Sequence, residues 1–582
     1  PSSASSTNDG DVHIGTSATL NMEANALSVG GDFDNDGTFS ASGSQTTTFT
    51  ATASGHTIDP NGSSFRNVTF AGGVSGVWSF TTTTTIDLDL TMTLGTLNSS
   101  NGTAPITVNG GDATGAGIIS LTNSNFTLNA TGSFGSTVVW TFSNLTFGAA
   151  TPGTTSGTGT GSITVNSVLT ISSSHVLNAS AAGVAKIWNL TATGTPFVNS
   201  GTFTAVLSTF DYEGAGSTTI TAATYNNLRS QPTSGSPTHY LGSAAGQTFA
   251  INSDLTIGDG TNAVTLDANT RDPILDIASD FVLSSNGTFL ASNSGVFTIA
   301  EDFTDNGTFT HNSGNVTFDG SATSTFSGSG TPVTTFSSFT SATDNKVLEF
   351  ATGTTWQINA TFTIDGSSGN EIKIQSNSSG TQWFINHQGT ENITYASVLD
   401  GGCASTSTNI TVQSSINRGN NDFCWLFPSL AFSLDSVSKS LNLTSANTFT
   451  ATATSILTVT STSEFGYDVT AYQTDNLRHT AYSTIIIANW PGTNAAPTVW
   501  TDTCQGNSDC GWGYNTNDTD LGQFVATEYA AFVTSTPGDV VARSTIAISG
   551  DVTTITYRSS VSATQTAGQY QTTIIYIVTP EF

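Results

Sequence analysis

Charged side chains are scarce in this sequence, and positively charged ones are the scarcest. Only 9% of its 582 residues are charged, and 11 Lys and Arg stand against 41 Asp and Glu, so the formal net charge is −30. Nucleic acids and anionic lipid surfaces are bound mainly through cationic side chains. The deficit therefore argues against both partners, and it suits a secreted protein that meets divalent cations.

Long apolar runs are also missing. No stretch approaches the roughly 18 apolar residues that a membrane-spanning helix needs, and the apolar segment from Thr573 to Val578 has only the length of a strand. The chain opens on Pro1 without an initiator methionine, a signal peptide or a sorting motif for covalent wall attachment. We therefore expect no membrane span and a processed start.

Cysteine is rare, and its few copies lie in two local pairs. Cys403 and Cys424 are 21 residues apart, and Cys504 and Cys510 are 6 apart. Neither spacing is that of a zinc site, and no histidines cluster beside them. We therefore predict the disulfides Cys403–Cys424 and Cys504–Cys510, which form in an oxidising, extracellular compartment.

What the sequence does contain is Thr, Ser, Gly and Asn, together with 34 Phe and 9 Trp. Such a composition also occurs in disordered chains, but here Phe, Ile, Val and Leu alternate with Thr and Ser over most of the length. Thr favours pleated strands, and Gly and Asn favour the tight turns between them. The composition therefore predicts an all-β protein.

A cassette that begins Gly-Thr-Phe and ends on an aromatic residue occurs three times. Its copies run from Gly37 to Phe65, from Gly201 to Tyr225 and from Gly307 to Phe336. Units of this size cannot bury their own apolar faces and must stack on their neighbours. The sequence therefore predicts a long repetitive β structure, in which function lies in shape and surface.

The finest period of the repeat is 22 residues, from Phe281 to Phe303. This period favours a parallel β-helix over residues 1–426, with about 19 coils stacked at about 4.8 Å into a rod of about 90 Å. Antiparallel hairpins or a string of β-sandwiches remain the alternative, because periodicity does not distinguish the direction of pairing. We expect seven Phe side chains to point inward: Phe39, Phe49, Phe65, Phe289, Phe309, Phe318 and Phe336.

Residues 427–582 lack the cassette. Cys403 and Cys424 are about one coil apart and would staple the last coil, and the apolar stretch Phe423–Phe432 then forms a cap and linker. Short alternating segments follow, separated by turn signals, and they predict an antiparallel, immunoglobulin-like β-sandwich. The expected strands include Thr448–Ala453, Leu457–Thr460, Tyr467–Tyr472, Ser483–Ile487, Ser544–Ile548, Thr553–Tyr557 and Gln571–Val578.

Five pieces of the repeat carry a resemblance: Phe142–Thr146, Gln247–Phe249, Leu255–Ile257, Asn306–Phe309 and Val316–Gly320. The cassette resembles one in large surface proteins of uncultured ultrasmall bacteria (Patescibacteria) and other environmental microbes. The segments Gly466–Tyr472 and Ile574–Phe582 look like the terminal sandwich of such proteins. The resemblance covers nearly the whole chain. It implies a β-helix protein of a surface layer (S-layer) or appendage, and it carries over no catalytic residues.

Three acidic residues, Asp32, Asp34 and Asp36, match the opening of a D-x-D-x-D-G calcium loop. The twelfth position of that loop is Gly43, where an EF-hand needs a bidentate Glu. The segment also aligns with the repeat turn Glu301–Gly307. A calcium site that recruits an oxygen from another loop and an ordinary repeat turn are therefore both open.

A second group of oxygen ligands follows Cys510. Asn515, Asn517, Asp518 and Asp520 crowd one loop, and Asp502 and Asp509 lie nearby in sequence. Hard oxygen donors at this density are the ligands that Ca²⁺ prefers. The alternative is a polar loop tied by the Cys504–Cys510 disulfide. Calcium is thus the one possible cofactor that the sequence indicates.

Evidence for catalysis is thin. Asp87 and Asp89 display carboxylates in the manner of pectate lyases, but no Lys or Arg near them could act as base or anion clamp. The seven histidines are scattered singly, and no nucleophile elbow, HExxH motif or phosphate loop is present. We therefore expect no enzyme and no catalytic residue.

Tryptophan offers one further surface hypothesis. The residues concerned could form a sugar-stacking platform, although packing in a core or cap is the favoured interpretation: Trp356, Trp383, Trp425, Trp490, Trp500 and Trp512.

These observations favour a secreted, self-assembling structural protein of the cell surface, a subunit of a surface layer or extracellular fibre whose main partner is itself. An adhesin or carbohydrate-binding protein that contacts cell-surface glycans is the alternative, and a glycan-active β-helix enzyme follows both.

Overall fold

The computed structural model describes residues 4–5, 10–148, 152–328, 333–445, 448–463, 465–501, 504 and 510–581. The chain divides into two compact units. The solenoid unit comprises residues 1–410 and 417–425, and the C-terminal unit comprises residues 411–416 and 426–582. The described residues form strands and turns without an α-helix. None of them builds a helix of the length and apolarity that crossing a membrane requires.

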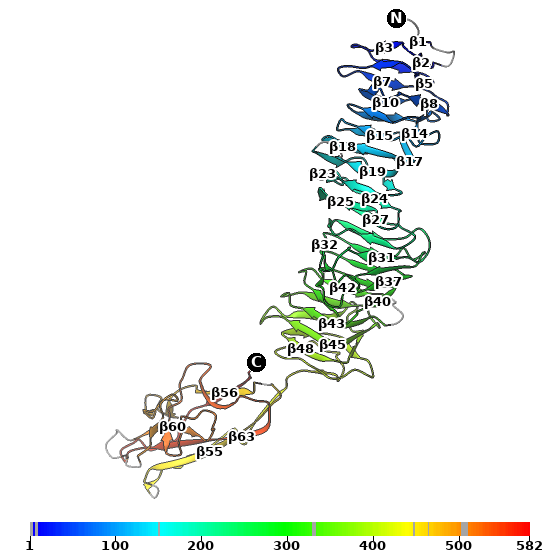
Figure 1. Cartoon of the computed structure of the whole chain (residues 1–582). Coiled ribbons are helices and arrows are strands. Elements are labelled where there is room, and N and C mark those ends of the chain that lie inside the picture. The colour runs from blue at the N-terminus through cyan, green and yellow to red at the C-terminus, as the bar shows by residue number, and fades with distance from the viewer. Residues whose placement is uncertain are drawn as a thin grey trace. The chain divides into compact units, whose positions relative to one another are not determined.

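The solenoid unit is a parallel β-solenoid of about 18 turns (Figure 1). One coil consists of β36 (Phe281–Leu283), β37 (Gly287–Leu290) and β38 (Phe297–Ile299). The chain then returns to β39 (Phe303–Asp305), which pairs in parallel with β36 and places Phe303 next to Phe281. The predicted period of 22 residues is therefore one coil, and the predicted parallel pairing of the coils is confirmed.

Three strand faces enclose the core. A 25-stranded sheet runs the length of the solenoid. The long strands β17 (Ile118–Leu128) and β19 (Trp140–Phe147) extend over two neighbouring faces, because each pairs with two shorter strands. For β17 the two shorter partners are β14 (Thr96–Asn98) and β15 (Ile106–Val108).

The remaining face is a nine-stranded sheet in the first half of the solenoid. Its strands are β4 (Leu27–Val29), β7 (Thr46–Phe49), β10 (Asn67–Ala71), β13 (Leu90–Leu94), β16 (Ala113–Gly115), β18 (Gly132–Ser136), β20 (Gly153–Gly157), β23 (His175–Asn178) and β26 (Thr202–Thr204).

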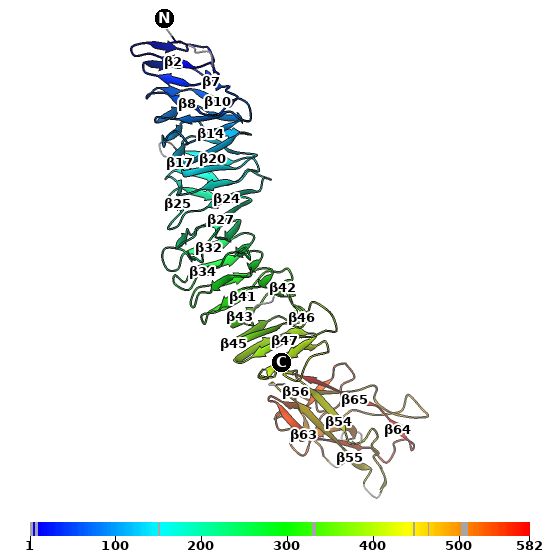
Figure 2. The ribbon, with the colours of Figure 1, turned by 90° about the vertical axis from the view of Figure 1, so that its right-hand side faces the viewer.

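In the second half, two further sheets accompany the 25-stranded one (Figure 2). The five-stranded sheet contains β28 (Thr218–Ile220), β31 (Thr238–Leu241), β34 (Val264–Asp267), β37 and β40 (Thr308–Thr310). The ten-stranded sheet contains β29 (Thr224–Tyr225), β32 (Thr248–Ile251), β35 (Ile274–Ile277), β38, β41 (Asn315–Phe318), β43 (Thr335–Ser341), β45 (Thr355–Asp365), β47 (Trp383–His387), β48 (Thr390–Thr394) and β50 (Gly401–Cys403).

Aromatic rings stack along the interior of the solenoid. All seven Phe residues that the repeat places inward are buried, which confirms the alignment. Rings from successive coils lie face to face, as in Phe281–Phe303 at 5.0 Å and Phe326–Phe350 at 4.4 Å between centroids. Such contacts add to the burial of each ring, so the core is continuous from coil to coil.

The glycine that opens the cassette is required by the neighbouring coil. A Cβ atom on Gly37, Gly201 or Gly307 would lie within 3.0 Å of backbone carbonyl oxygens of the preceding coil. Asn35 and Asp305, two residues before Gly37 and Gly307, accept hydrogen bonds from the amides of these glycines at 3.2 and 3.1 Å. These two copies of the cassette therefore begin with an Asx turn, and in all three copies the glycine packs against the coil before it.

Two lysines lie inside the solenoid. The Lys186 ammonium donates to the carbonyls of Thr158, Gly159 and Gly161, and the Lys346 ammonium donates to those of Ala300, Gly320 and Ala322. Burial lowers the pKa of each lysine to about 8. Lys186 thus joins its coil to the preceding one, and Lys346 also reaches Ala300, 46 residues and about two coils earlier.

Both predicted disulfides are present. Cys403, on β50, is bonded to Cys424 with a Cα–Cα distance of 6.2 Å, and Cys504 is bonded to Cys510. The 21 residues between Cys403 and Cys424 amount to about one coil. The first disulfide therefore closes the C-terminal end of the solenoid unit.

The C-terminal unit contains antiparallel sheets, as predicted. The four-stranded sheet has the order β54 (Leu430–Leu434), β55 (Thr450–Ser461), β63 (Ile548–Ser560) and β60 (Gly511–Thr516). The three-stranded sheet has the order β62 (Asp539–Ser544), β56 (Tyr467–Gln473) and β65 (Ile574–Pro580). Smaller pairs involve β57 (Leu477–His479), β58 (Ile486–Ile487), β59 (Thr498–Val499), β61 (Glu528–Tyr529) and β64 (Tyr570–Gln571).

The two larger sheets of this unit share one hydrophobic core. Leu457 and Ile555 from the four-stranded sheet and Val469 and Val541 from the three-stranded sheet belong to the same buried cluster. The charged pair between Arg543 and Asp468 spans adjacent strands of the three-stranded sheet, with two nitrogen–oxygen contacts of 2.7 Å.

Candidate functional site

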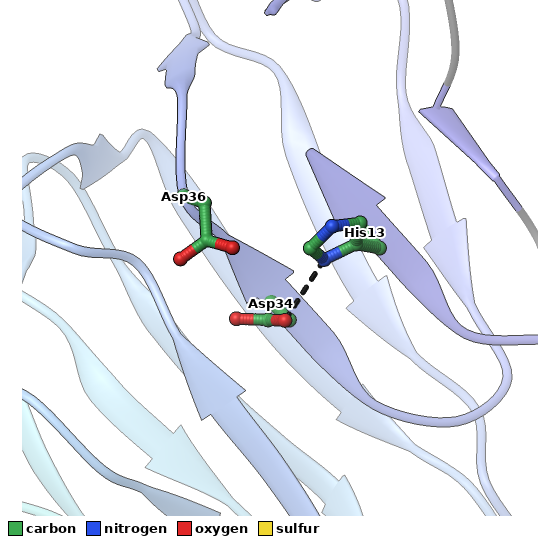
Figure 3. Close-up of side chains that lie close together, drawn as sticks. All are labelled: His13, Asp34 and Asp36. Carbon is green, nitrogen blue, oxygen red and sulfur yellow. Dashed lines mark hydrogen bonds and ion pairs between the residues drawn. The ribbon is translucent and has the colours of Figure 1, made fainter. Parts of the chain in front are cut away.

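The acidic segment near the N-terminus brings together two of its three predicted ligands. Asp34 on β5 (Phe33–Asn35) lies beside His13 on β2 (Val12–Ile14), because the two strands pair in register. The Asp34 carboxylate is 2.8 Å from His13 Nδ1, and Asp36 completes a group whose ligand atoms all lie within 4.8 Å of one another (Figure 3). All three side chains are exposed.

Asp32 does not join this group. Its carboxylate accepts a hydrogen bond from the Thr57 amide at 2.8 Å and is 3.3 Å from His56 Nδ1. The intervening Asn35 is buried and forms the Asx turn of the repeat. The segment is therefore a repeat turn that also displays two carboxylates and an imidazole.

The His13–Asp34–Asp36 group has a mixed ligand chemistry. Carboxylate oxygens suit Ca²⁺, whereas an imidazole nitrogen suits zinc and other transition metals. The group offers three exposed side chains as metal ligands. Two of them, His13 and Asp34, already bond to each other in the absence of an ion. Calcium at this turn stays a prediction. The sequence pattern did not identify His13 as a ligand, because it lies 21 residues from Asp34 and only the stacking of coils brings the two side chains together.

The predicted ligands after Cys510 hold the backbone of the C-terminal unit together. Asn515 donates to the carbonyls of Val525 and Glu528, and Asn517 accepts from the Thr554 amide. Asp518 accepts from the amides of Arg543 and Asp520. These bonds turn the oxygens of Asn517 and Asp518 toward amides. Asp502 and Asp509 lie outside the described residues, and calcium here also stays a prediction.

The carboxylates of Asp87 and Asp89 lie in a corner of the solenoid between β12 (Thr84–Ile86) and β13, and not on one strand. Asp89 accepts from the Asp112 amide, and Asp87 accepts from the Ser64 hydroxyl at 2.9 Å. Arg66, from the preceding coil, contacts Asp87 at 3.4 Å. The expectation that no cation lies near was therefore wrong, because coil stacking supplies one. Both carboxylates cross-link neighbouring coils.

Three histidines form hydroxyl–imidazole pairs that a sequence motif would not reveal. Ser230 Oγ is 2.8 Å from His239 Nδ1, and Thr155 Oγ1 is 2.9 Å from His175 Nε2. His387 Nδ1 is 2.9 Å from Thr408 Oγ1. The three imidazoles are fully buried, as is Ser230, and burial lowers the pKa of His239. The imidazole rings are therefore inaccessible to a substrate, although Thr408 itself is exposed, and the pairs satisfy polar groups of the solenoid.

The tryptophans proposed as a sugar-stacking platform are buried. All six have exposed fractions of 5% or less. Trp383 stacks on Phe350 within the solenoid, and Trp490 stacks on Trp500 at 3.9 Å within the C-terminal unit. Core packing is therefore their role, and an aromatic platform from these residues is ruled out.

Asp211 is a buried carboxyl group that the sequence analysis missed. It lies on β27 (Ser208–Tyr212), a strand on which every residue is buried, and it pairs in register with Arg229 of the next coil. Burial, reinforced by the nearby Glu213, raises the pKa of Asp211 to about 7. Its Oδ1 atom has no hydrogen-bond partner. The group is therefore a proton-binding position inside the physiological pH range.

A shallow polar groove lies on the C-terminal unit, along the paired strands β57 and β64. Its walls consist of Thr474, Asp475, Arg478, His479, Thr480, Ser483, Gln571, Thr572 and Thr573. Asp475 and Arg478 form an ion pair, so the groove has little local net charge. Tyr482, 59% exposed, lies beside it with its ring 5.0 Å from that of His479.

In comparisons with protein-family models, with curated proteins and with solved structures, nothing matches this chain. Its function is therefore inferred below from the geometry of the molecule.

Proposed function

We propose that this protein is a secreted structural component of a cell surface, a self-assembling subunit of a surface layer or an extracellular fibre. The observation that carries the proposal is the solenoid itself, about 18 parallel turns around a continuous aromatic core. At about 4.8 Å per turn the solenoid unit is a rod of about 85 Å. A rod of this kind is suited to spanning a distance as a stiff element, because each coil is held by the coils on both sides.

Three further features support an extracellular structural role. The two disulfides persist in an oxidising compartment. Asp87, Asp89 and the three buried histidines of the solenoid bond to groups of neighbouring coils and so hold coils together. The resemblance of the cassette to repeats of bacterial surface proteins points the same way.

Electron microscopy of the purified protein, with and without Ca²⁺, tests the proposal. We expect identical subunits to form ordered arrays or filaments as their concentration rises. Sedimentation of separate monomeric rods at every protein and calcium concentration would overturn it.

The polar groove of the C-terminal unit favours one second candidate, a carbohydrate-binding adhesin. Hydroxyl, amide, guanidinium and carboxylate groups line the groove, and an exposed tyrosine ring lies beside it. Neutral sugars are recognised by such hydrogen-bonding groups together with an aromatic face.

Binding of neutral oligosaccharides to a glycan array tests this candidate. We expect Arg478→Ala and Tyr482→Ala to abolish the signal, while the solenoid variant Arg66→Ala retains it. An unaltered signal in the two groove variants would remove the groove as the site.

A further inference from the structure

A long segment of the solenoid carries no surface charge. Between Asp112 and Asp211 the sequence contains two ionisable side chains, His175 and Lys186, and both are fully buried. Lys186 is bound by three backbone carbonyls, and His175 by Thr155. We name residues 113–210 the uncharged belt.

The uncharged belt surrounds the solenoid on every face. It contains five successive strands of the nine-stranded sheet, β16, β18, β20, β23 and β26, and the parts of the 25-stranded sheet that complete these coils. Residues 149–151, outside the described part of the chain, are Ala, Ala and Thr and add no charge. Five coils at about 4.8 Å give the belt a length of about 24 Å along the axis.

Uncharged side chains cover this surface in a regular order. Thr127, Thr146 and Thr170 lie in register on successive coils and point outward between buried neighbours. Several large aliphatic side chains of the belt are also exposed: Ile118, Val139, Ile187, Val198 and Leu207. The surface thus combines hydroxyl groups with apolar groups.

The belt is bordered by acidic groups on both sides. Asp87, Asp89 and Asp112 precede it, Glu213 follows it, and the whole chain has a net charge of −30. Two copies that approach each other elsewhere bring like charges together, which costs several kcal/mol when the charges are juxtaposed. At the belt this repulsion is smallest.

We propose that the uncharged belt is the surface through which copies of this chain pack side by side. The inference rests on the proposed assembly and names the contact that forms it. A second copy is the occupant that the charge distribution selects, because only a partner with the same acidic surface requires a charge-free contact. A neutral glycan has no such requirement.

The size of the belt determines the kind of assembly. A face about 24 Å long and about as wide offers on the order of 600 Å², less than the roughly 800 Å² per partner of a standard stable interface. A single contact is therefore weak. Because every face of the belt is uncharged, each copy contacts more than one neighbour, and repeated contacts build an open array where one pair would not persist.

Two matched sets of substitutions test the inference. The belt variant carries Thr127→Glu, Thr146→Glu and Thr170→Glu, and the control carries Thr265→Glu, Thr288→Glu and Thr308→Glu. The control threonines also lie in register on three successive coils, are half-buried and point outward. Both sets add the same charge in the same kind of column, so their effects on folding and net charge are matched.

We expect the belt variant to raise the protein concentration needed for assembly by at least about tenfold, equivalent to about 1.4 kcal/mol per subunit added. The control should stay close to the unaltered protein. Melting temperatures of both variants show whether each is folded.

A second measurement does not depend on the charged variants. The described residues contain no free cysteine, so Thr146→Cys and Thr288→Cys each supply a single reactive thiol. In assembled protein a short thiol cross-linker should join copies through position 146 and not through position 288.

The possible failures are distinguishable. Equal assembly of the belt and control variants, with no cross-link through position 146, overturns the belt and leaves the proposed function standing. Absence of assembly by the unaltered protein overturns both. Normal assembly of the belt variant together with lost binding of a neutral polysaccharide would identify the belt as a glycan surface and overturn the inference.

Discussion

At the scale of single residues, several ionisable groups of the solenoid hold its coils together. Lys186 and Lys346 bind backbone carbonyls, and Asp89 and Arg66 connect neighbouring coils. Asp211 differs from these residues because one of its carboxylate oxygens has no hydrogen-bond partner. Its protonation therefore affects the stability of the folded state directly.

The stability of the solenoid should depend on pH through Asp211. The pKa of this group is about 7 in the folded protein against 3.8 for a free aspartate. Between these values the folded state holds a proton that the unfolded state has lost, so stability falls as the pH rises from about 4 to 7. Asp211→Asn should remove a few kcal/mol of this penalty.

Thermal unfolding at pH 5 and pH 8 measures the effect. Asp211→Asn should raise the melting temperature more at pH 8 than at pH 5. An equal shift at both values would show that ionisation of Asp211 costs the fold nothing.

At the scale of the strand and turn, the cassette glycine is the most restrictive position. A Cβ on Gly201 would press against the carbonyl oxygens of Ser172 and His175, whereas a Cβ on Gly73 meets only ordinary contacts with Thr52 at 3.4 Å or more. Gly201→Ala should therefore destabilise the protein by about 1–3 kcal/mol. Gly73→Ala should change stability little. Denaturant unfolding of the two variants measures the difference, and equal midpoints would contradict the steric account.

The last coil depends on its disulfide. In the chain-entropy picture, closing a loop of about 20 residues stabilises the folded state by about 3 kcal/mol. The double variant Cys403→Ser/Cys424→Ser should lose most of this amount, and Cys504→Ser/Cys510→Ser should lose less because its loop is much shorter. Hydrogen exchange should show faster opening around β50 in the first variant. Unchanged exchange there would mean that stacking alone holds the coil.

Much of this fold is predictable because the coil has a nearly constant length. The spacing of Phe281 and Phe303, the inward aromatic rings and the Cys403–Cys424 pair all follow from one period. The contacts between coils are less accessible from sequence, because they depend on register. His13 with Asp34 and Arg66 with Asp87 are each 21 residues apart, and no local pattern joins them.

Burial of outward positions was not predictable at all. Asp211 occupies a position where alternation predicts exposure, yet all of β27 is buried. For the tryptophans, the composition did not show whether the rings form an exposed sugar-stacking platform or pack in a core. Their burial is set by the position of each ring on an inward or outward face.

At the scale of the whole molecule, the net charge of −30 sets the conditions of assembly. Divalent cations screen and neutralise carboxylates, and the His13–Asp34–Asp36 group is the one such cluster of His, Cys, Asp and Glu found in the described part of the chain. We predict that Ca²⁺ raises the melting temperature or tightens arrays and that EDTA reverses this. An ion at one hundred times its dissociation constant stabilises the folded form by about 2.7 kcal/mol.

Calorimetric titration with Ca²⁺ and with Zn²⁺ separates the two kinds of ligand chemistry. Asp34→Asn should weaken whichever ion binds at the N-terminal turn, with Asp365→Asn on the far part of the solenoid as a control. If neither ion changes melting or array order, metal has no part in the structure.

The direction of the hydrogen bonds in the solenoid has a mechanical consequence. Bonds between parallel coils run along the axis, so a pull on the two ends of the rod loads the coils in series, and they peel away one after another. A coil of 22 residues lengthens the chain by about 70 Å when it opens, since an extended residue spans about 3.4 Å and the coil itself occupies about 4.8 Å. Single-molecule stretching should therefore give regular steps of about this size. With the Cys403–Cys424 disulfide intact, the 21 residues between the two cysteines cannot extend and add no length. The first coil to open is therefore one outside this disulfide-closed segment.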